Sequence, residues 1–167
     1  PANEQNLDRL AAEVLRGASM SPLTTARLTL RAFTPDDASF IVELLNDRDW
    51  LRFIGDRQVR TQDDALAYLR KGDVAQAKHG FALGAVQRTS DGALIGKCGL
   101  IRREGLDDVD LGYAFLPAYR GQGYAREAAA AWLACGFERF GLKRIVAITS
   151  VDNVASVKVL EAIGVRF

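Results

Sequence analysis

The chain has 167 residues, of which 49% are hydrophobic and 26% are charged, and its formal net charge is +1 at pH 7. This composition predicts one compact domain with a sizeable core. The small net charge argues against a nucleic-acid-binding face or a polybasic membrane anchor, and no apolar run reaches the roughly 18 residues of a membrane span. Charges throughout the first 20 residues argue against a signal peptide, so the cytoplasm is the expected location.

Residues 1–22 are expected to be an extension that precedes the domain of residues 23–167. The chain begins at Pro1, and its only methionine is Met20. Residues 1–19 are therefore either a processed or vector-derived segment or an extra amphipathic helix. The helix is suggested by apolar residues that fall on one helical face, namely Leu7, Leu10, Ala11, Val14 and Leu15.

The first half of the domain is predicted to contain a strand and two helices. Residues 27–33 alternate as a strand does. Thr34, Pro35 and Asp37 then supply the start of a helix that reaches about Asn46. Residues 61–64 repeat this start signal, and Gly72 is the expected end of the second helix.

The second half is predicted to begin with three strands. Residues 81–88 and 93–102 are apolar strands joined by a turn, and a third strand covers residues 109–116. An alanine-rich helix follows over residues 124–140, and then comes a short buried strand over residues 144–150.

A last helix is capped by Asn153 and ended by Gly164. The order β-α-α-β-β-β-α-β-α predicts an α+β fold with a mixed, largely antiparallel sheet flanked by helices. Another strand is expected after that glycine, so it either lies beyond Phe167 or is supplied by a partner.

No metal site or disulfide is predicted. Cys98 and Cys135 are far apart in apolar patterns, which favours buried, reduced thiols. His79 is the only histidine, and no cysteine or paired acid lies near it in the sequence.

The most informative segment covers residues 110–125, where a strand stops at Pro117 and a glycine-rich turn leads into a helix. Gly121 and Gly123 allow backbone N–H groups to crowd one concave spot. The helix dipole makes that spot attractive to anions, which points to a phosphate-bearing cofactor. A tight turn without a ligand is the alternative.

Three segments resemble the GNAT acyl-CoA N-acyltransferases, in particular the Rim-type acetyltransferases that modify ribosomal-protein N-termini. Residues 120–125 match the family's Arg/Gln-x-x-Gly-x-Gly/Ala loop, and residues 110–113 match its acid-apolar-Gly-Tyr strand. Residues 153–156 and 160–164 match its Asn-x-x-Ser helix, with Val165 in place of a phenylalanine. The resemblance covers residues 23–167 and implies the GNAT fold, acetyl-CoA as cosubstrate and no metal.

The resemblance also implies which residues bind the cosubstrate. The pyrophosphate would be held by backbone N–H groups of Gly121, Gln122, Gly123, Tyr124 and Ala125. Arg120 or Arg126 would add positive charge, although Arg126 could equally face solvent. The pantetheine would lie beside the backbone of Ala114, Phe115 and Leu116 like an added strand, and Asn153 would bind the cofactor arm or an ordered water.

Two side chains are candidates for proton transfer. Asp110 is the candidate base, acting through a water, and its alternative role is a strand acid paired with an arginine. Ser156 is the candidate donor to the leaving thiolate, and its alternative role is a helix hydroxyl that bonds a backbone carbonyl. A backbone N–H near Phe115 or Leu116 would stabilise the oxyanion.

The acceptor is expected to be a primary amine that attacks directly in a ternary complex. At pH 7 roughly one lysine side chain in 2,500 is neutral, against about one α-amine in six, which favours a peptide or protein N-terminus. A small amine or aminoglycoside-like compound is the second expectation. Glu104, Asp107 and Asp108 either attract a cationic acceptor or form a solvated loop.

Relatives place the acceptor cleft near the positions of Trp50 and Phe53. Two functions of other classes remain open, namely a non-catalytic acyl-CoA-binding module and a partner-binding domain without a cofactor. A homodimer is also left open.

Overall fold

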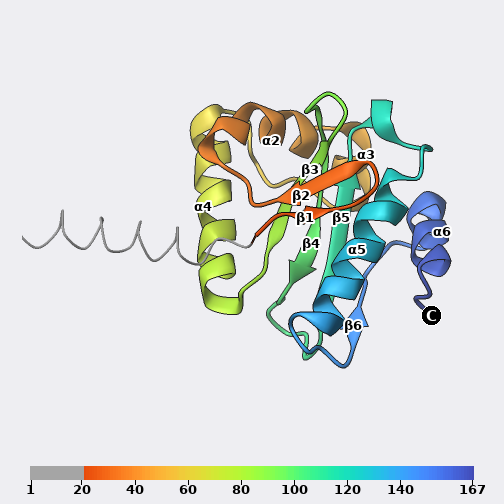
Figure 1. Ribbon diagram of the computed structural model, residues 1–167. Helices are drawn as coiled ribbons and strands as arrows, with labels where there is room; N and C mark the ends of the chain where they lie inside the picture. The colour runs from red at the N-terminus through yellow and green to blue at the C-terminus, as the bar shows by residue number, and fades with distance from the viewer. Residues whose placement is uncertain (1–20) are drawn as a thin grey trace, which may run out of the picture.

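The computed structural model describes residues 21–167, and the predicted N-terminal helix lies outside this range. A six-stranded sheet forms its centre, and the strands follow one another in chain order (Figure 1). All neighbours are antiparallel except the last pair, which is parallel. The strands are β1 (Leu23–Thr24), β2 (Leu28–Arg31), β3 (Leu83–Arg88), β4 (Leu94–Ile101), β5 (Val109–Phe115) and β6 (Ile145–Val146).

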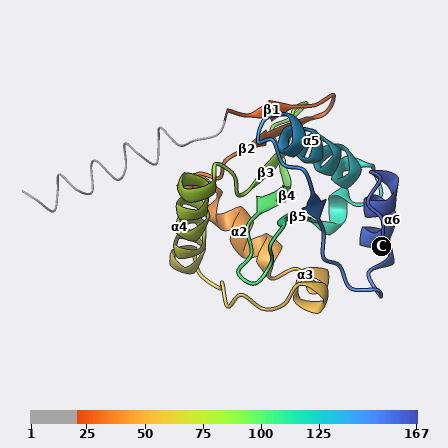
Figure 2. The same ribbon diagram turned by 90° about the horizontal axis from the view of Figure 1, so that it is seen from below.

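Helices cover both faces of the sheet, which confirms the predicted α+β class (Figure 2). One face carries α2 (Ala38–Leu45), α3 (Arg48–Phe53) and α4 (Gln62–His79). The other carries α5 (Tyr124–Glu138) and α6 (Val154–Ala162). Two short 3₁₀ helices, η1 (Pro35–Asp37) and η2 (Pro117–Tyr119), precede α2 and α5. Each face has its own buried cluster, one around Trp132 and one around Ile41 and Trp50.

The predicted end of α4 at Gly72 is wrong. The helix starts as expected at Thr61, whose Oγ1 accepts a hydrogen bond from the Asp64 N–H at 3.1 Å. It then continues through Gly72 to His79 and ends where Gly80 adopts a left-handed φ of 83°. A glycine inside a helix costs only about 1 kcal/mol relative to alanine, so it does not break a helix that is well started and capped.

The predicted strand over residues 144–150 is also largely wrong. Only Ile145 and Val146 form a strand, and both are half-buried. They pair with Val109 and Asp110, and the pairing goes no further. Within residues 21–167, the edge of β5 that faces β6 therefore has no neighbouring strand beyond Asp110.

Two elements were not predicted, namely β1 and α3. The start of α3 has a clear local cause, because the Asp47 carboxylate accepts hydrogen bonds from the N–H groups of Asp49 and Trp50, both at 3.2 Å. Trp50, in the first turn of this helix, is 5% exposed.

Cys98 and Cys135 are free and buried, as predicted. Burial raises the pKa of both thiols. Within residues 21–167 no helix combines the length and apolar character needed to cross a membrane.

Candidate active site

The start of α5 offers a group of unpaired backbone amides. Gly121 and Gly123 have φ values of 73° and 82°, and no side chain caps the helix. Within the described part of the chain, the N–H groups of residues 121–125 donate no hydrogen bond. A Cβ atom on Gly121 would meet nothing within 4 Å, so this corner is open. Unpaired donors at a helix N-terminus fit a diphosphate.

Arg27 fixes this loop, a role that the sequence did not indicate. Its Nη1 donates to the Gln122 carbonyl oxygen at 2.9 Å, and its Nε lies 2.8 Å from Glu127 Oε1. The guanidinium also lies 4.3 Å from the centroid of the Tyr124 ring. Arg27 therefore ties the glycine turn and the first turn of α5 to the connection between β1 and β2.

Arg120 connects the glycine turn with the end of β5 and with the start of α3. Its Nε donates to the Phe115 carbonyl oxygen at 2.9 Å, and its guanidinium pairs with Asp47, at 2.6 Å, and with Asp49. Burial alone would raise the pKa of Asp47, but the hydrogen bond from Arg120 holds it below its usual value. Arg120 thus joins the loop to the start of α3, and its contact with a phosphate stays a prediction.

The register of β4 and β5 shows which backbone groups of β5 are available. The Leu116 N–H donates to the Ile95 carbonyl oxygen at 3.0 Å, and the strands keep this register along β5. Because hydrogen-bonded and non-bonded pairs alternate, the N–H group of Ala114 points toward β4, whereas those of Tyr113 and Phe115 point to the open edge. The prediction that Leu116 could supply a free oxyanion donor is therefore wrong, and Phe115 remains a candidate.

Tyr113 and Ser156 lie together beyond the end of β6. The Tyr113 hydroxyl is 2.9 Å from Ser156 Oγ and donates to the Ser156 carbonyl oxygen at 3.1 Å. Burial raises the pKa of Tyr113. The Asn153 side-chain oxygen accepts from the Ser156 N–H at 3.2 Å, so Asn153 caps α6 as predicted. Tyr113 belongs to the strand motif of residues 110–113, but nothing in the pattern of neighbouring residues indicates its contact with Ser156.

Asp110 is an almost fully buried acid with one oxygen unpaired. Its residue is 1% exposed, and its Oδ2 accepts a hydrogen bond from Arg103 Nε. Its Oδ1 has no hydrogen-bond partner within the described residues. The arginine pairing that was the structural alternative is present, and a second carboxylate oxygen remains available.

A cavity of about 420 Å³ brings the proton-transfer candidates together. Asp110, Tyr113 and Ser156 line it, and Trp50 forms part of its wall. Phe53 does not line it. The predicted acidic loop lies elsewhere, since none of Glu104, Asp107 and Asp108 is among the lining residues.

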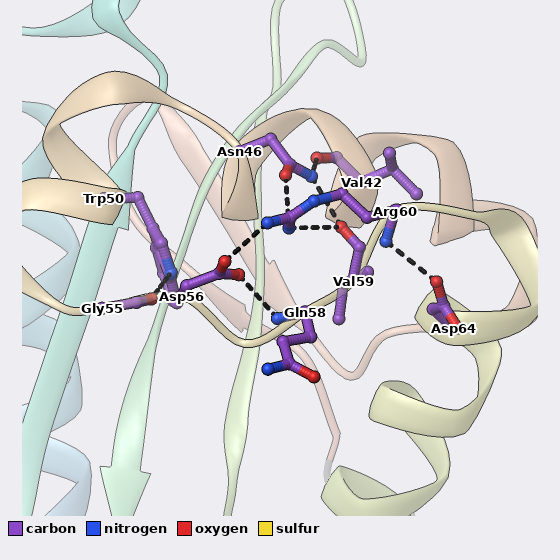
Figure 3. Close-up of polar contacts among 9 residues, drawn as sticks. All are labelled: Val42, Asn46, Trp50, Gly55, Asp56, Gln58, Val59, Arg60 and Asp64. Carbon is purple, nitrogen blue, oxygen red and sulfur yellow. Dashed lines mark hydrogen bonds and ion pairs between the residues drawn. The ribbon is translucent and has the colours of Figure 1, made fainter.

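A hydrogen-bonded connection between α3 and α4 forms one rim of this cavity (Figure 3). Trp50 Nε1 donates to the Gly55 carbonyl oxygen at 3.0 Å, and Asn46 Nδ2 donates to the Val59 carbonyl oxygen at 2.7 Å. Arg60 bonds both Asn46 Oδ1, at 2.8 Å, and Asp56 Oδ2, at 2.6 Å. These contacts tie residues 55–60 to α2 and α3, and Ile54 and Arg57 of this connection line the cavity.

Lys97 is the second buried charge at the cavity. It lies on β4, is 2% exposed, and donates from Nζ to the Tyr68 hydroxyl. Burial lowers its pKa. A lysine within the apolar sequence of residues 94–101 was a signal that sequence reasoning did not use.

No group of three or more potential metal ligands lies within residues 21–167. The donors that this chain provides are backbone amides at a helix start and along a strand edge. They suit a phosphorylated, amide-containing ligand.

Comparison with known proteins identifies the class. A sequence model of the acetyltransferase (GNAT) domain matches residues 27–166. The chain is 34% identical over 146 residues to the uncharacterized N-acetyltransferase YnaD of Bacillus subtilis, covering 86% of this chain and 82% of YnaD. The chain belongs to the GNAT acetyltransferase family.

Solved structures of this family share the fold. A GNAT-family acetyltransferase from Bacillus anthracis superposes with a TM-score of 0.74 at 29% identity, covering 87% of this chain and 84% of the other. The neighbours include Rim-type enzymes. RimL, the ribosomal L7/L12 α-N-protein acetyltransferase solved in complex with coenzyme A, has a TM-score of 0.75 at 19% identity.

Proposed function

We propose that this protein transfers an acetyl group from acetyl-CoA to the α-amine of a peptide or protein N-terminus, by direct attack in a ternary complex. The observation that carries the proposal is the cavity in which Asp110, with an unpaired carboxylate oxygen, meets the Tyr113–Ser156 pair. It lies along the part of β5 that pairs with β4 on one edge and, within residues 21–167, with no strand on the other.

Backbone groups would hold the cosubstrate. The N–H groups of residues 121–125 are suited to the pyrophosphate, because they are unpaired and lie at the positive end of α5. The open edge at Tyr113 and Phe115 is suited to the amide groups of the pantetheine. The Phe115 N–H would then be available to the oxygen of the thioester carbonyl as charge develops there.

Proton transfer would use two side chains. Asp110 accepts a proton from the acceptor ammonium, through a water, so that the neutral nitrogen attacks the thioester carbon. As the C–N bond forms and the C–S bond breaks, Ser156 donates its proton to the thiolate sulfur and takes up the second proton that the attacking nitrogen loses, so the serine ends neutral. The Tyr113 hydroxyl, 2.9 Å from Ser156 Oγ, orients this serine.

An α-amine is proposed as the acceptor because a larger fraction of α-amines than of lysine amines is neutral at pH 7. About one α-amine in six is already neutral at pH 7. Such an acceptor therefore depends only weakly on a base, and a buried aspartate with one unpaired oxygen can remove its proton. A lysine acceptor would need a far stronger base. RimL, which shares the fold, acts on an α-amine by its name, and this agrees with the proposal.

Thiol release from acetyl-CoA tests the proposal with two peptides that differ in where their single amine lies. One has a free N-terminus and no other amine, and the other has a blocked N-terminus and one lysine. We expect kcat/KM to be at least about tenfold higher for the free N-terminus. Binding of CoA without thiol release from any amine would instead indicate a non-catalytic module, and a preference for lysine would refute the choice of acceptor.

A further inference from the structure

Lys97 is a buried amine that forms no ion pair with any carboxylate of residues 21–167. Its Nζ donates to the Tyr68 hydroxyl and lies 4.7 Å and 5.2 Å from the ring centroids of Tyr68 and Trp50. Within residues 21–167 no carboxylate lies within 4.0 Å of it. A charge this deeply buried is stabilised strongly by any anion that reaches it.

The same cavity has an excess of positive side chains. Its charged lining residues are Arg57, Lys71, Lys97, Arg103 and Asp110. The single acid among them is already paired with Arg103. Arg57 and Lys71 are exposed and form no ion pair within the described residues. The electrostatic field in the cleft therefore favours an acceptor with negative charge.

The aromatic rings of the cleft also argue against a cationic acceptor. The faces of Trp50 and Tyr68 could attract a cationic ligand. The ammonium of Lys97 already occupies that position. A polycationic acceptor would be repelled by this lysine and by the two unpaired cations.

We infer that the acceptor carries a carboxylate close to its reactive amine, and that Lys97 binds this carboxylate with Arg57 and Lys71 around it. The inference rests on the proposed function and narrows its acceptor to an acidic N-terminal segment. Lys97 serves binding and specificity, whereas Asp110 and Ser156 serve proton transfer.

Hydrogen bonds in the connection between α3 and α4 restrain the backbone that carries Arg57. Arg57 lies between Asp56 and Gln58, and the Gln58 N–H donates to Asp56 Oδ1 at 2.7 Å (Figure 3). Arg60 binds the other oxygen of the same carboxylate. These bonds restrain the backbone on both sides of Arg57, so less backbone entropy is lost when its side chain binds an anion.

The coenzyme does not account for these charges. None of residues 121–125, which form the candidate diphosphate site, lines the cavity. The two sites therefore make separate predictions, because loss of Lys97 should change the choice of acceptor and leave CoA affinity unchanged.

The test uses three peptides with the same N-terminal alanine, an amidated C-terminus, and Glu, Gln or Lys at the second position. Thiol release gives kcat/KM for each. We expect Glu to exceed Gln by about tenfold, the size of one charge-assisted hydrogen bond, and Lys to be the poorest acceptor. In Lys97→Met the Glu/Gln ratio should fall to within about twofold, while the CoA dissociation constant stays unchanged.

Lys78→Met is the matched control. Lys78 lies in the last turn of α4 and does not line the cavity, so the same change in net charge should leave the ratio intact. If Lys97→Met does not fold, Arg57→Gln at the exposed rim tests the same claim and should lower the ratio at least about twofold.

Release of thiol without preference for Glu, or a ratio that Lys97→Met leaves unchanged, would overturn the inference and leave the proposed function standing. Absence of thiol release with every peptide would refute both the inference and the proposed function.

The pH dependence of the Glu/Gln ratio gives an independent readout. The groups that face Lys97 across the cavity are Tyr68 and Lys71 from α4, Arg57 from the rim, Arg103 from the connection after β4, and Asp110 on β5. The Glu/Gln ratio should decline with rising pH before an ordinary lysine would lose its proton.

Discussion

The hydroxyl of Tyr113 lies 2.9 Å from Ser156 Oγ and joins the open edge of β5 to the first turns of α6. Burial raises the pKa of the phenol, so it stays protonated at neutral pH and can act as a hydrogen-bond donor. Ser156 thus has a defined partner and orientation beside the strand edge on which a thioester would lie.

Replacing Ser156 by alanine should lower kcat by about 10²-fold, because the leaving thiolate loses its proton donor. The dissociation constant for CoA should change little, since the diphosphate site is elsewhere. Steady-state kinetics and calorimetric titration measure the two quantities, and Ser90→Ala in the exposed turn between β3 and β4 is the control. A kcat within twofold of wild type would show that Ser156 takes no part.

Asp110→Asn should lower the rate on a lysine side chain more than the rate on an α-amine. The amide cannot accept a proton, and the lysine amine depends on this step far more because so little of it is neutral. The ratio of kcat/KM for a lysine peptide and an N-terminal peptide measures the effect. Equal losses for the two amines would remove Asp110 as the base.

Gly123→Ala should weaken CoA binding by at least about tenfold. The left-handed φ of 82° costs a non-glycine residue about 1–2 kcal/mol, and the new Cβ would lie 3.3 Å from Arg27 Nη2. Gly105→Ala is a matched control, because Gly105 has a φ of 83°, nothing within 4 Å of its Cβ position and a place in the loop before β5. Titration with CoA should separate the two variants, and an equal affinity would refute the amide site.

Lys97→Met should raise the stability of the protein at pH 7. Burial lowers the pKa of Lys97 in the folded state below its unfolded value, so the charged side chain opposes folding at neutral pH. The cation–π contacts with Trp50 and Tyr68 offset part of this cost. A net gain on the order of 1 kcal/mol would raise Tm by about 2–4 °C.

The lowered pKa of Lys97 also determines how the stability of the wild-type protein changes with pH. Between the folded and unfolded pKa values the unfolded wild-type chain binds more protons, so wild-type stability rises with pH there. The advantage of the variant should therefore shrink as the pH approaches about 10.4, the unperturbed lysine pKa. Thermal melts from pH 7 to 10 measure it, and a variant less stable than wild type throughout would contradict the account.

Local signals in the sequence were sufficient for most elements of the fold. The capping residues of α4 and α6 and the glycine turn before α5 act through contacts within a few residues, so their patterns predicted the structure. The end of α4 was mispredicted because Gly80 and not Gly72 adopts the left-handed conformation, and that choice depends on the whole helix.

The contacts that shape the candidate site come from distant parts of the chain. Arg27 reaches Gln122 across 95 residues, and Tyr113 reaches Ser156 across 43. The free edge of β5 depends on its register with β4 and on the short length of β6. None of these relationships produces a pattern in neighbouring residues, so the sequence motifs indicated the site without its geometry.

The most direct test of acetyl transfer at this cavity is tandem mass spectrometry of a peptide incubated with the protein and acetyl-CoA. The peptide should carry an N-terminal alanine followed by glutamate, with one lysine further along. The account predicts one acetyl group, on the N-terminal nitrogen. An unmodified peptide in a sample where the protein has bound CoA, or an acetyl group on the lysine alone, would contradict it.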